Sequence, residues 1–392
     1  MSGSFLQRGT AAILDKWTRA ELAVQNGCDA VFELPFLFSC RSAQDFARGG
    51  VQLLNRLGVV NTLAFGAETK DLETLQTIAT AIDTPTIQEM LHKRIGTGDS
   101  YATALTAVLH EERKTAAEIL HQPNNILAIE YLRALKQYAP SISPLLIPRH
   151  GGGYHDHSLA HDNASASAIR KALYEASQAA KTSGGRLLIP QLAKQQDRLL
   201  SQALPPATRL ALADLTTGSL PDPDALLLPL RALLLRTDTA SIQRIYGINE
   251  GLENRIGKFA ATATDFSELS ANLSTKRYPI SRIKRTLIWL LLGLSKQQVR
   301  LADEHGPLYA RLLAVSGQGR SLLSAIKQKG QIPLITKTAT YLTSKQRSLA
   351  PETLSPLQQQ LRCDTLATEL RQLTIASPIH CRNDFQQSPR FF

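Results

Sequence analysis

The stretch from Gly151 to Ala172 contains the residue types that could bind an anion. It begins with three glycines, passes three histidines and ends in helical sequence, where Asn163 and Ser165 are good N-cap residues. Arg170 and Lys171 follow near the start of that helix, where cations oppose the helix dipole. Because phosphate commonly binds at helix N-termini, the pattern indicates a phosphate site. Taken alone, the stretch favours the alternative, an ordinary helix start with solvent-facing cations.

The basic charge of the chain is concentrated in one segment. The 392 residues carry a net charge of +11, from 44 Lys and Arg against 33 Asp and Glu. Residues 271–350 contain 14 Lys and Arg but only two acids, Asp303 and Glu304. Such a segment is expected of a protein that binds a polyanion. A solvated basic face without a partner is the alternative, and the near absence of acids argues against it.

The first part of the chain alternates between strands and helices. Strands are predicted over 30–34, 59–65 and 143–148, and helices over 15–26, 43–57, 71–82, 86–94, 101–112 and 126–138. This order indicates a parallel sheet with helices on its faces. Ligands of such sheets bind beyond the carboxyl ends of the strands. The polar features expected to meet there are Gly66, Arg149, His150 and the opening loop with Arg8.

The later part of the chain is predicted to be mostly helical. One helix reaches about residue 181, and the stretch from 190 to 223 mixes prolines with polar residues, as linkers do. No strand is expected between 225 and 333, and a short extended piece is expected over 332–339. The helices predicted there span 225–235, 241–246, 252–260, 266–273, 281–292 and 308–313. The last residues, 376–392, are polar and are expected to form a loose tail.

Several classes of protein are disfavoured by the sequence. The four cysteines, Cys28, Cys40, Cys363 and Cys381, lack C-x-x-C spacing, which argues against a zinc site or a disulfide framework. Reduced thiols in a cytoplasmic protein are the simplest interpretation. The longest apolar run, 287–294, is far short of the roughly 20 residues that span a bilayer. The first residues contain no apolar segment of the kind found in secretory signals.

Ten stretches, in order and reaching about Gly319, match one known family. They are SGSFLQRG (Ser2–Gly9), DKWTRAELA (Asp15–Ala23), ELPF (Glu33–Phe36), FARGGVQLLN (Phe46–Asn55), FGAE (Phe65–Glu68), PNNILAIEY (Pro123–Tyr131), YHD with ASASAIRKA (Tyr154–Ala172), EGLENRI (Glu250–Ile256), TKRYPISRIKR (Thr275–Arg285) and LYARLLAVSGQG (Leu308–Gly319). Together they resemble the tRNA(Met) cytidine acetate ligase family, a branch of the nucleotidyltransferase-like superfamily.

The resemblance implies a fold and an activity. The fold class would be α/β, a Rossmann-like parallel-sheet nucleotidyltransferase domain followed by a mostly α-helical basic domain. The implied domains are 1–190 for ATP and acetate activation, 191–224 as a connection, 225–375 for tRNA binding, and 376–392 as the tail. The enzyme would form acetyl-adenylate from ATP and acetate, with Mg²⁺. It would then acetylate N4 of the wobble cytidine of elongator tRNA(Met).

The resemblance also assigns site residues. The residues that match ATP-contacting positions are Gly66, Asn124, Arg149, His150, Ser167, Arg170 and Lys171. Fixed cations and N–H groups there would stabilise the charge that develops on the phosphates during adenylation. The candidates for contacts with the tRNA backbone are Arg277, Arg282, Lys284 and Arg285. No metal-ligating residue is assigned, and no protein partner is evident from the sequence.

The family's sequence starts upstream of this one. It begins with a first strand and a motif bearing two histidines that contacts ATP, and Met1 corresponds to the end of its second strand. No catalytic residue is therefore assigned here. Either the start codon has been placed too far downstream, or the chain is a truncated descendant. We favour the first explanation because the downstream ATP-site residues are present.

Two other functions are compatible with the sequence. One is a non-catalytic RNA-binding descendant that has lost ATP turnover. The other is a relative that transfers a nucleotidyl group to a small metabolite, although a small metabolite needs no extended basic surface. The identity of the activated carboxylate, the way in which Mg²⁺ is held, and the oligomeric state do not follow from the sequence.

We expect the intact protein from its own cells to have a mass above the 42.9 kDa of this sequence. Its additional peptides should contain a strand and the paired histidines. Intact-mass spectrometry with peptide mapping makes this measurement. A mass equal to that of this sequence would instead favour the non-catalytic RNA-binding function.

Overall fold

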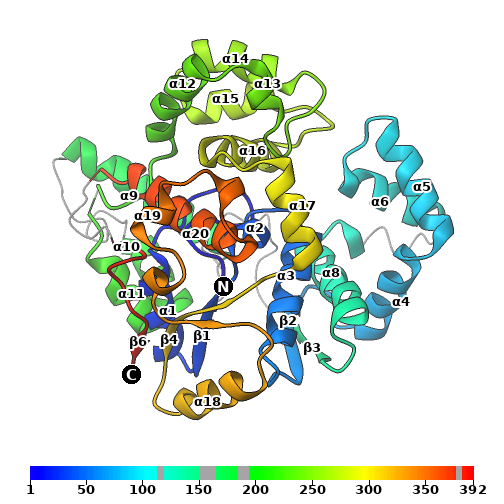
Figure 1. Cartoon of the computed structure of the whole chain (residues 1–392), viewed down its shortest axis with the longest axis vertical. Helices are drawn as coiled ribbons and strands as arrows, with labels where there is room; N and C mark the ends of the chain where they lie inside the picture. Colours follow the sequence, from blue (N-terminus) through cyan, green and yellow to red (C-terminus); the bar gives the residue numbers. More distant parts are fainter. Residues whose placement is uncertain (113–118, 150–164, 184–193, 217, 377–381) are drawn as a thin grey trace.

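The computed structural model describes residues 1–112, 119–149, 165–183, 194–216, 218–376 and 382–392 (Figure 1). The strands are β1 (Ala30–Glu33), β2 (Thr62–Ala67), β3 (Ser143–Pro148), β4 (Ala310–Val315), β5 (Leu334–Ile335) and β6 (Arg390–Phe391). The helices up to residue 213 are α1 (Lys16–Gln25), α2 (Phe36–Ser39), α3 (Ala43–Arg56), α4 (Leu72–Ile82), α5 (Pro85–Gly96), α6 (Tyr101–Glu112), α8 (Pro123–Tyr138), α9 (Ala166–Ser183), α10 (Lys194–Ala203) and α11 (Pro206–Ala213).

The remaining helices follow in the second part of the chain. They are α12 (Leu227–Arg236), α13 (Thr239–Gln243), α14 (Leu252–Thr262), α15 (Phe266–Leu273), α16 (Ile280–Leu292), α17 (Lys296–His305), α18 (Gly319–Lys329), α19 (Ser344–Arg347) and α20 (Pro356–Leu373). Short 3₁₀ helices span Pro223–Leu226, Thr338–Thr340 and Pro351–Thr353. Most elements predicted from the sequence are confirmed to within a few residues.

The strands form two sheets. In the larger one β4 is central, pairing antiparallel with β1 and parallel with β5 and β6. In the smaller one β2 and β3 run parallel, with Gly66 opposite Ile147. The predicted α/β class is therefore confirmed, and the parallel arrangement holds for β2 and β3. The sheet that contains β1 is mixed, because its partner β4 enters from the far end of the chain.

The predicted helix over 308–313 is wrong, since this segment is strand β4. The expectation of no strand between 225 and 333 fails with it. Every residue of β4 is buried, so the sequence shows no alternation between apolar and polar positions. A continuous apolar run of this length fits a buried strand and a buried helix equally well. The central strand of the larger sheet thus lacks the pattern by which strands are usually found.

Two further expectations need correction. The segment predicted as an irregular connection contains helices α10 and α11. Pro205 and Pro206 stand at the start of α11, where a helix tolerates proline. The tail is not loose over the described residues 382–392, because β6 pairs with β4 and Asp384 is buried. The chain therefore returns to its beginning: the C-terminal strand lies in the same sheet as β1 (Figure 1).

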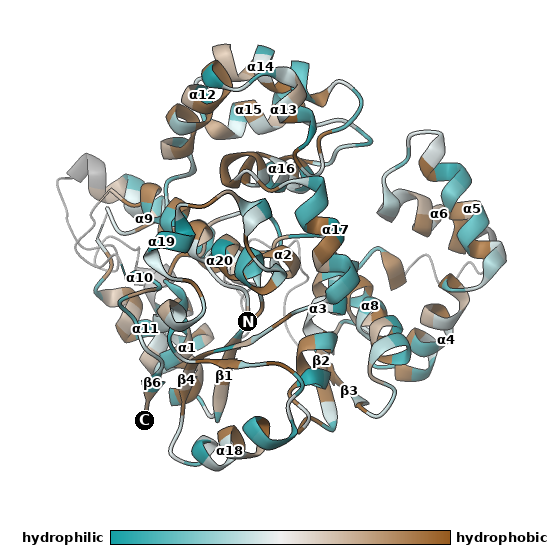
Figure 2. Ribbon diagram, viewed as in Figure 1, coloured by the Kyte–Doolittle hydropathy of each residue, from teal (hydrophilic) through white to brown (hydrophobic). Residues whose placement is uncertain are grey.

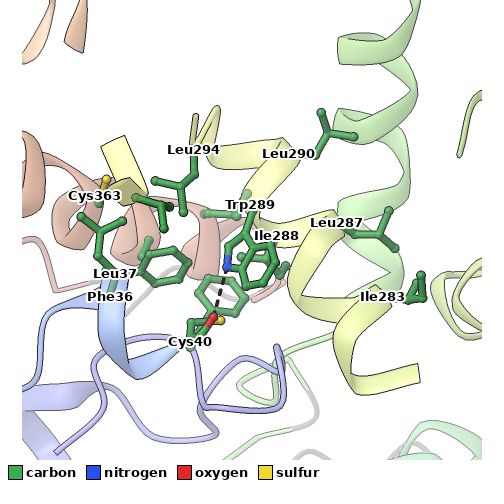
Figure 3. Close-up of a cluster of buried hydrophobic side chains, with 14 of the residues drawn as sticks. Phe36, Leu37, Cys40, Ile283, Leu287, Ile288, Trp289, Leu290, Leu294 and Cys363 are labelled. Atoms are coloured by element: carbon green, nitrogen blue, oxygen red, sulfur yellow. Dashed lines mark hydrogen bonds between the residues drawn. The ribbon is translucent and has the colours of Figure 1, made fainter. Parts of the chain in front are cut away.

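Helix α16 connects the larger core to the helices above it. Ile283, Leu287 and Leu290 recur at helical spacing and are buried in a cluster that includes Phe36 and Cys363 (Figure 3). The indole N–H of Trp289 donates to the carbonyl of Cys40 at 3.1 Å. In Figure 2, α16, β1 and β4 are among the apolar elements. The helix that carries three of the predicted RNA contacts is thus anchored in the core by its apolar face.

A buried cluster of charges joins α1, β1, β4 and the C-terminal segment. The ammonium group of Lys16 lies 2.9 Å from Glu33 and 2.6 Å from Asp384, and all three side chains are at most 2% exposed. Arg311 of β4 pairs with the same two carboxylates. Although burial alone would raise the pKa of Asp384, Arg311 and Lys16 lower it to about 2. Two cations therefore neutralise two carboxylates away from water.

None of the helices in the described ranges is long and apolar enough to cross a membrane. The three cysteines that the structure describes, Cys28, Cys40 and Cys363, are free thiols, and Cys381 lies outside the described residues.

Replacing Lys16 with Met should lower the free energy of unfolding by about 3–5 kcal/mol, because one buried carboxylate would lose its compensating charge. Denaturant unfolding monitored by circular dichroism measures this change. The matched control is Lys327→Met on the exposed side of α18, which should stay within about 0.5 kcal/mol of the wild type. Equal stabilities of the two variants would contradict a stabilising role for the cluster.

Candidate functional site

One group of predicted site residues lies at the carboxyl ends of β2 and β3. Because the strands are parallel, the N–H of Arg149 donates to the carbonyl of Ala67 at 2.9 Å and places Arg149 beside Gly66. A Cβ atom on Gly66 would lie 3.4 Å from Cγ of Arg149. Gly66 therefore leaves its backbone open next to a cation. His150, also predicted here, lies outside the described residues.

The turn that follows Gly66 is held by the N-terminal end of α8. The Glu68 carboxylate accepts from the Asn124 amide at 2.6 Å and from the Asn125 N–H at 2.9 Å. Asn125 Oδ1 in turn accepts the N–H groups of Glu68 and Thr69 at 2.9 and 3.1 Å. A carboxylate at a helix N-terminus is favoured by the helix dipole. Gly66, Asn124 and Arg149 are thus brought together around one turn.

Glu68 and Asn125 were not predicted as site residues. Glu68 belongs to the matching stretch FGAE, which also contains the predicted site residue Gly66. Asn125 directly follows the predicted site residue Asn124. Their mutual hydrogen bonds link positions that are 57 residues apart in sequence. Only the fold reveals that they fix the geometry around Gly66.

A second group of predicted residues lies on α9. Ser165 accepts the N–H of Ala168 at 3.1 Å, which confirms it as a cap. Arg170 donates to Ser167 Oγ at 3.4 Å, whereas Lys171 is exposed and lies 3.8 Å from Glu175. Figure 1 shows α9 at the left edge of the molecule, and β2 and β3 below and to the right of its centre. The structure therefore does not bring these three residues to the Gly66 group.

Arg170 instead lines a cavity of about 760 Å³ together with the opening loop. Gly9 and Thr10 of that loop, Tyr174 of α9 and Lys284 of α16 share this lining. The loop rests on α16: a Cβ on Gly9 (φ +75°) would lie 2.6 Å from the backbone nitrogen of Arg285. The opening loop therefore lies with α9 and α16, and neither Gly66, Asn124 nor Arg149 lines this cavity.

The four predicted RNA contacts are divided between two cavities. Arg277, Arg282 and Arg285 line a second cavity of about 800 Å³, whereas Lys284 lines the first. Burial lowers the pKa of the Arg285 guanidinium. Burial and the nearby Arg8 lower the pKa of Lys284. These cations are partly removed from water without full compensation by carboxylates, which is an arrangement suited to an anionic ligand.

Part of the basic segment has internal partners. Arg311 is buried in the cluster with Glu33 and Asp384, and Arg347 pairs with Glu369. The charge of +12 over 271–350 therefore overstates the surface available to a ligand. The cations of this segment that form no ion pair with a described residue lie in two places. One group is on and beside α16, and the other is on α18 and in the residues that follow it.

Comparison with known proteins supports a single family. The family described as HIGH Nucleotidyl Transferase matches residues 1–386. The tRNA(Met) cytidine acetate ligase of Syntrophomonas wolfei is 37% identical over 398 aligned positions, covering 99% of this chain and 90% of the relative. The protein of the same name from Halothermothrix orenii is 33% identical, covering 96% and 87%.

Two solved structures share the fold. TmcAL from Thermotoga maritima in its apo form I has a TM-score of 0.81 and 26% sequence identity, covering 100% of this chain and 91% of that chain. TmcAL from the same organism bound with alpha-thio ATP, in form II, has a TM-score of 0.78 at the same identity and coverage. The likeness thus extends over the whole chain and includes a structure with an ATP analogue.

Replacing Asn125 with Ala should lower the free energy of unfolding by about 1–3 kcal/mol, because buried hydrogen-bonding groups of the turn would lose their partner. Asn125 is only 1% exposed. Asn124→Ala, which removes one hydrogen bond at a half-exposed position, should cost about 1 kcal/mol or less. Denaturant titrations of both variants test this order, and the reverse order would contradict it.

Proposed function

This chain belongs to the tRNA(Met) cytidine acetate ligase family, and we propose that it is an ATP-dependent acetate ligase that modifies the wobble cytidine of elongator tRNA(Met). The observation that carries the proposal is the likeness over 99% of the chain to a ligase of that name. The grouping of Gly66, Asn124 and Arg149 at the ends of two parallel strands supports it, since nucleotides bind at this edge of α/β sheets.

The reaction has two steps. First, an oxygen of acetate attacks the α-phosphorus of ATP, the bond to the bridging oxygen breaks, and pyrophosphate leaves with the electron pair. Second, N4 of the cytidine attacks the acetyl carbon of acetyl-adenylate, the bond from this carbon to the phosphate oxygen breaks, and AMP leaves. N4 loses one proton in this second step. Both steps shift negative charge onto phosphate oxygens, so fixed cations lower the barriers.

The residues near β2 and β3 fit the first step. Arg149 forms no ion pair with another described residue, so its guanidinium is available to phosphate oxygens. Gly66 lets a nucleotide approach the backbone without meeting a side chain. Asn124 lies at the start of α8, where one N–H of its amide is bound to Glu68 and the amide oxygen can accept a hydrogen bond from the nucleotide. We assign Mg²⁺ to the ATP phosphates, since this small cation is usually bound through them together with one or two carboxylates.

The basic residues around α16 fit the second substrate. Arg282 and Arg285 share one cavity and lie on a helix anchored in the core, so their positions are fixed before RNA arrives. Sequence-specific proteins usually recognise RNA through unpaired bases in loops. The anticodon loop of a tRNA provides such bases. Ser167, Arg170 and Lys171 on α9 stay proposed phosphate contacts, which requires α9 to approach the ATP site when the nucleotide binds.

The purified protein should exchange labelled pyrophosphate into ATP only when acetate is present, and should transfer labelled acetate to elongator tRNA(Met). Arg149→Ala should lower kcat/KM for ATP in this exchange by about 10²-fold, because one charged donor to the phosphates is lost. The control is Arg236→Ala, an exposed cation at the end of α12. RNA binding without any acetate-dependent exchange would contradict the ligase function and favour a non-catalytic RNA-binding protein.

A further inference from the structure

The cavity of about 800 Å³ has walls from distant parts of the chain. One wall comes from the start of α3, from α6 and from α8, and the other comes from the segment after α13 and from α16 and α17. Its basic lining residues are Arg277, Arg282, Arg285, Lys296 and Arg300, and its acidic ones are Asp45, Glu130 and Asp303. Whether the acids neutralise the basic residues decides whether the cavity can bind an anion.

The acids of the lining already have cationic partners that do not line the cavity. Each carboxylate forms at least one ion pair with an arginine behind the wall. The pairs are Asp45 with Arg41 and Arg48, Asp303 with the same two arginines, and Glu130 with Arg133 at 2.8 Å. The ion pairs of these carboxylates are therefore with arginines outside the cavity, and among the lining cations Asp45 also favours the charged form of Arg285.

Three of the five cations form no ion pair with another described residue. Arg277 lies 2.7 Å from Glu250, and Arg300 lies 3.4 Å from Glu304 in the next turn of α17. In contrast, Arg282, Arg285 and Lys296 form no ion pair within the described ranges. Nε of Arg285 is buried and has no hydrogen-bond partner there. Arg285 Nη1 donates to the carbonyl of Gln7 at 3.1 Å, so an anion with several acceptor oxygens would pair with Arg282, with Lys296 and with the remaining N–H groups of Arg285.

The same cavity has an aromatic wall. Tyr101, Tyr246 and Trp289 line it, together with the aliphatic Ile126. The rings of Tyr246 and Trp289 lie 4.7 Å apart between centroids. Gly247 (φ +80°) lets the backbone lie against the indole, because a Cβ there would be 2.6 Å from Trp289 Cζ3. Because Trp289 is only 4% exposed, most of the aromatic surface in the cavity comes from Tyr101 and Tyr246. Unpaired nucleotides are bound by this combination of aromatic surface and nearby cations.

Helix α8 places the cavity next to the candidate ATP site. Its first turn carries Asn124, which lies at the Gly66 group, and Ile126 and Glu130 of the same helix line the cavity. The helix rises about 1.5 Å per residue, so the six positions from Asn124 to Glu130 span about 9 Å along the axis. A nucleotide in the cavity would therefore lie close to an adenylate bound at Gly66.

We infer that this cavity receives the acceptor nucleotide of the RNA, turned out of the anticodon loop, with a phosphate at Arg282, Arg285 and Lys296 and the base against the aromatic wall. This inference rests on the proposed function, because it identifies the nucleotide with the cytidine that is acetylated. Turning a loop nucleotide outward costs less than opening a duplex, since the base is already unpaired. The cavity thus selects a single-stranded substrate by shape.

The test uses an anticodon stem-loop of elongator tRNA(Met) that carries 5-iodocytidine at the wobble position. Ultraviolet irradiation of its complex with the protein should link this base to peptides containing Tyr101, Tyr246 or Trp289, as identified by mass spectrometry. A link to peptides of α9 or α18 would overturn the inference. Loss of the link in the presence of ATP alone, without acetate, would mean that the cavity is a site for the free nucleotide and would also overturn it.

A variant that fills the cavity provides a second test. Ser281 of α16 lines the cavity, and Ser281→Trp should reduce the yield of the cross-link at least tenfold. The matched control is Ser324→Trp on α18, an exposed position outside the cavity, where the yield should equal that of the wild type. Circular dichroism establishes that both variants are folded. A folded Ser281→Trp variant with the wild-type yield would overturn the inference.

The proposed phosphate contacts can be tested through the salt dependence of RNA binding. In the double variant Arg282→Ala with Lys296→Ala, the slope of log affinity for the stem-loop against log salt should become shallower by about 1.4, since each contact with single-stranded RNA contributes about 0.7. Lys327→Ala with Lys329→Ala removes two exposed cations of the same basic segment and should leave the slope unchanged. Equal slopes for the two double variants would overturn the phosphate assignment.

The cross-link and the salt slope require no catalysis, so they separate this inference from the proposed function. Pyrophosphate exchange with acetate could fail while the wobble base still cross-links to the aromatic wall. This result would contradict the ligase function and support the assignment of the cavity to a nucleotide. If pyrophosphate exchange proceeds but the cross-link lies outside the cavity, only the assignment of the cavity is contradicted.

Discussion

The burial of Lys16, Glu33, Arg311 and Asp384 in one cluster is the interaction on which the arrangement of this molecule depends. Isolated charges are too costly to remove from water, so each of these side chains requires the others in place. They come from α1, from the end of β1, from β4 and from the C-terminal segment. Their mutual neutralisation fixes β4 beside β1 and fixes the last residues against both. The beginning and the end of the chain are therefore parts of one structural unit.

The side chains of helix α16 have two roles, packing in the core and lining the cavities. Its apolar face packs into the core next to Phe36 and Cys363. Its cations face two cavities, because Arg282 and Arg285 line one and Lys284 lines the other. Charge counted along the sequence cannot separate these roles, nor can it identify Arg311 as an internal partner of Glu33. The surface that can attract RNA is thus smaller and better defined than the basic segment itself.

Local signals made much of the fold predictable. The strand over 30–34, the helix that starts after Ser42 and the parallel pair β2–β3 all follow from periodicity, caps and alternation. Strand β4 was missed because burial on both faces removes its alternation. Gly66 and Arg149 were predicted as neighbours because parallel strands end at the same edge, whereas the position of α9 depends on tertiary packing. The hydrogen bonds between Glu68 and Asn125 depend on long-range contacts in the same way.

The pairing of β1 with β4 has a consequence for the synthesis of this protein. Lys16 and Glu33 leave the ribosome early, but Arg311 and Asp384 follow only after most of the chain has been translated. At about 5–20 residues per second, roughly 15–55 s separate the synthesis of Glu33 from that of its partner Arg311. During that interval the nascent chain keeps these charges hydrated, and β1 lacks its neighbour. Completion of the larger sheet is therefore a late event of biosynthesis, and an interrupted chain leaves the ribosome without its central strand.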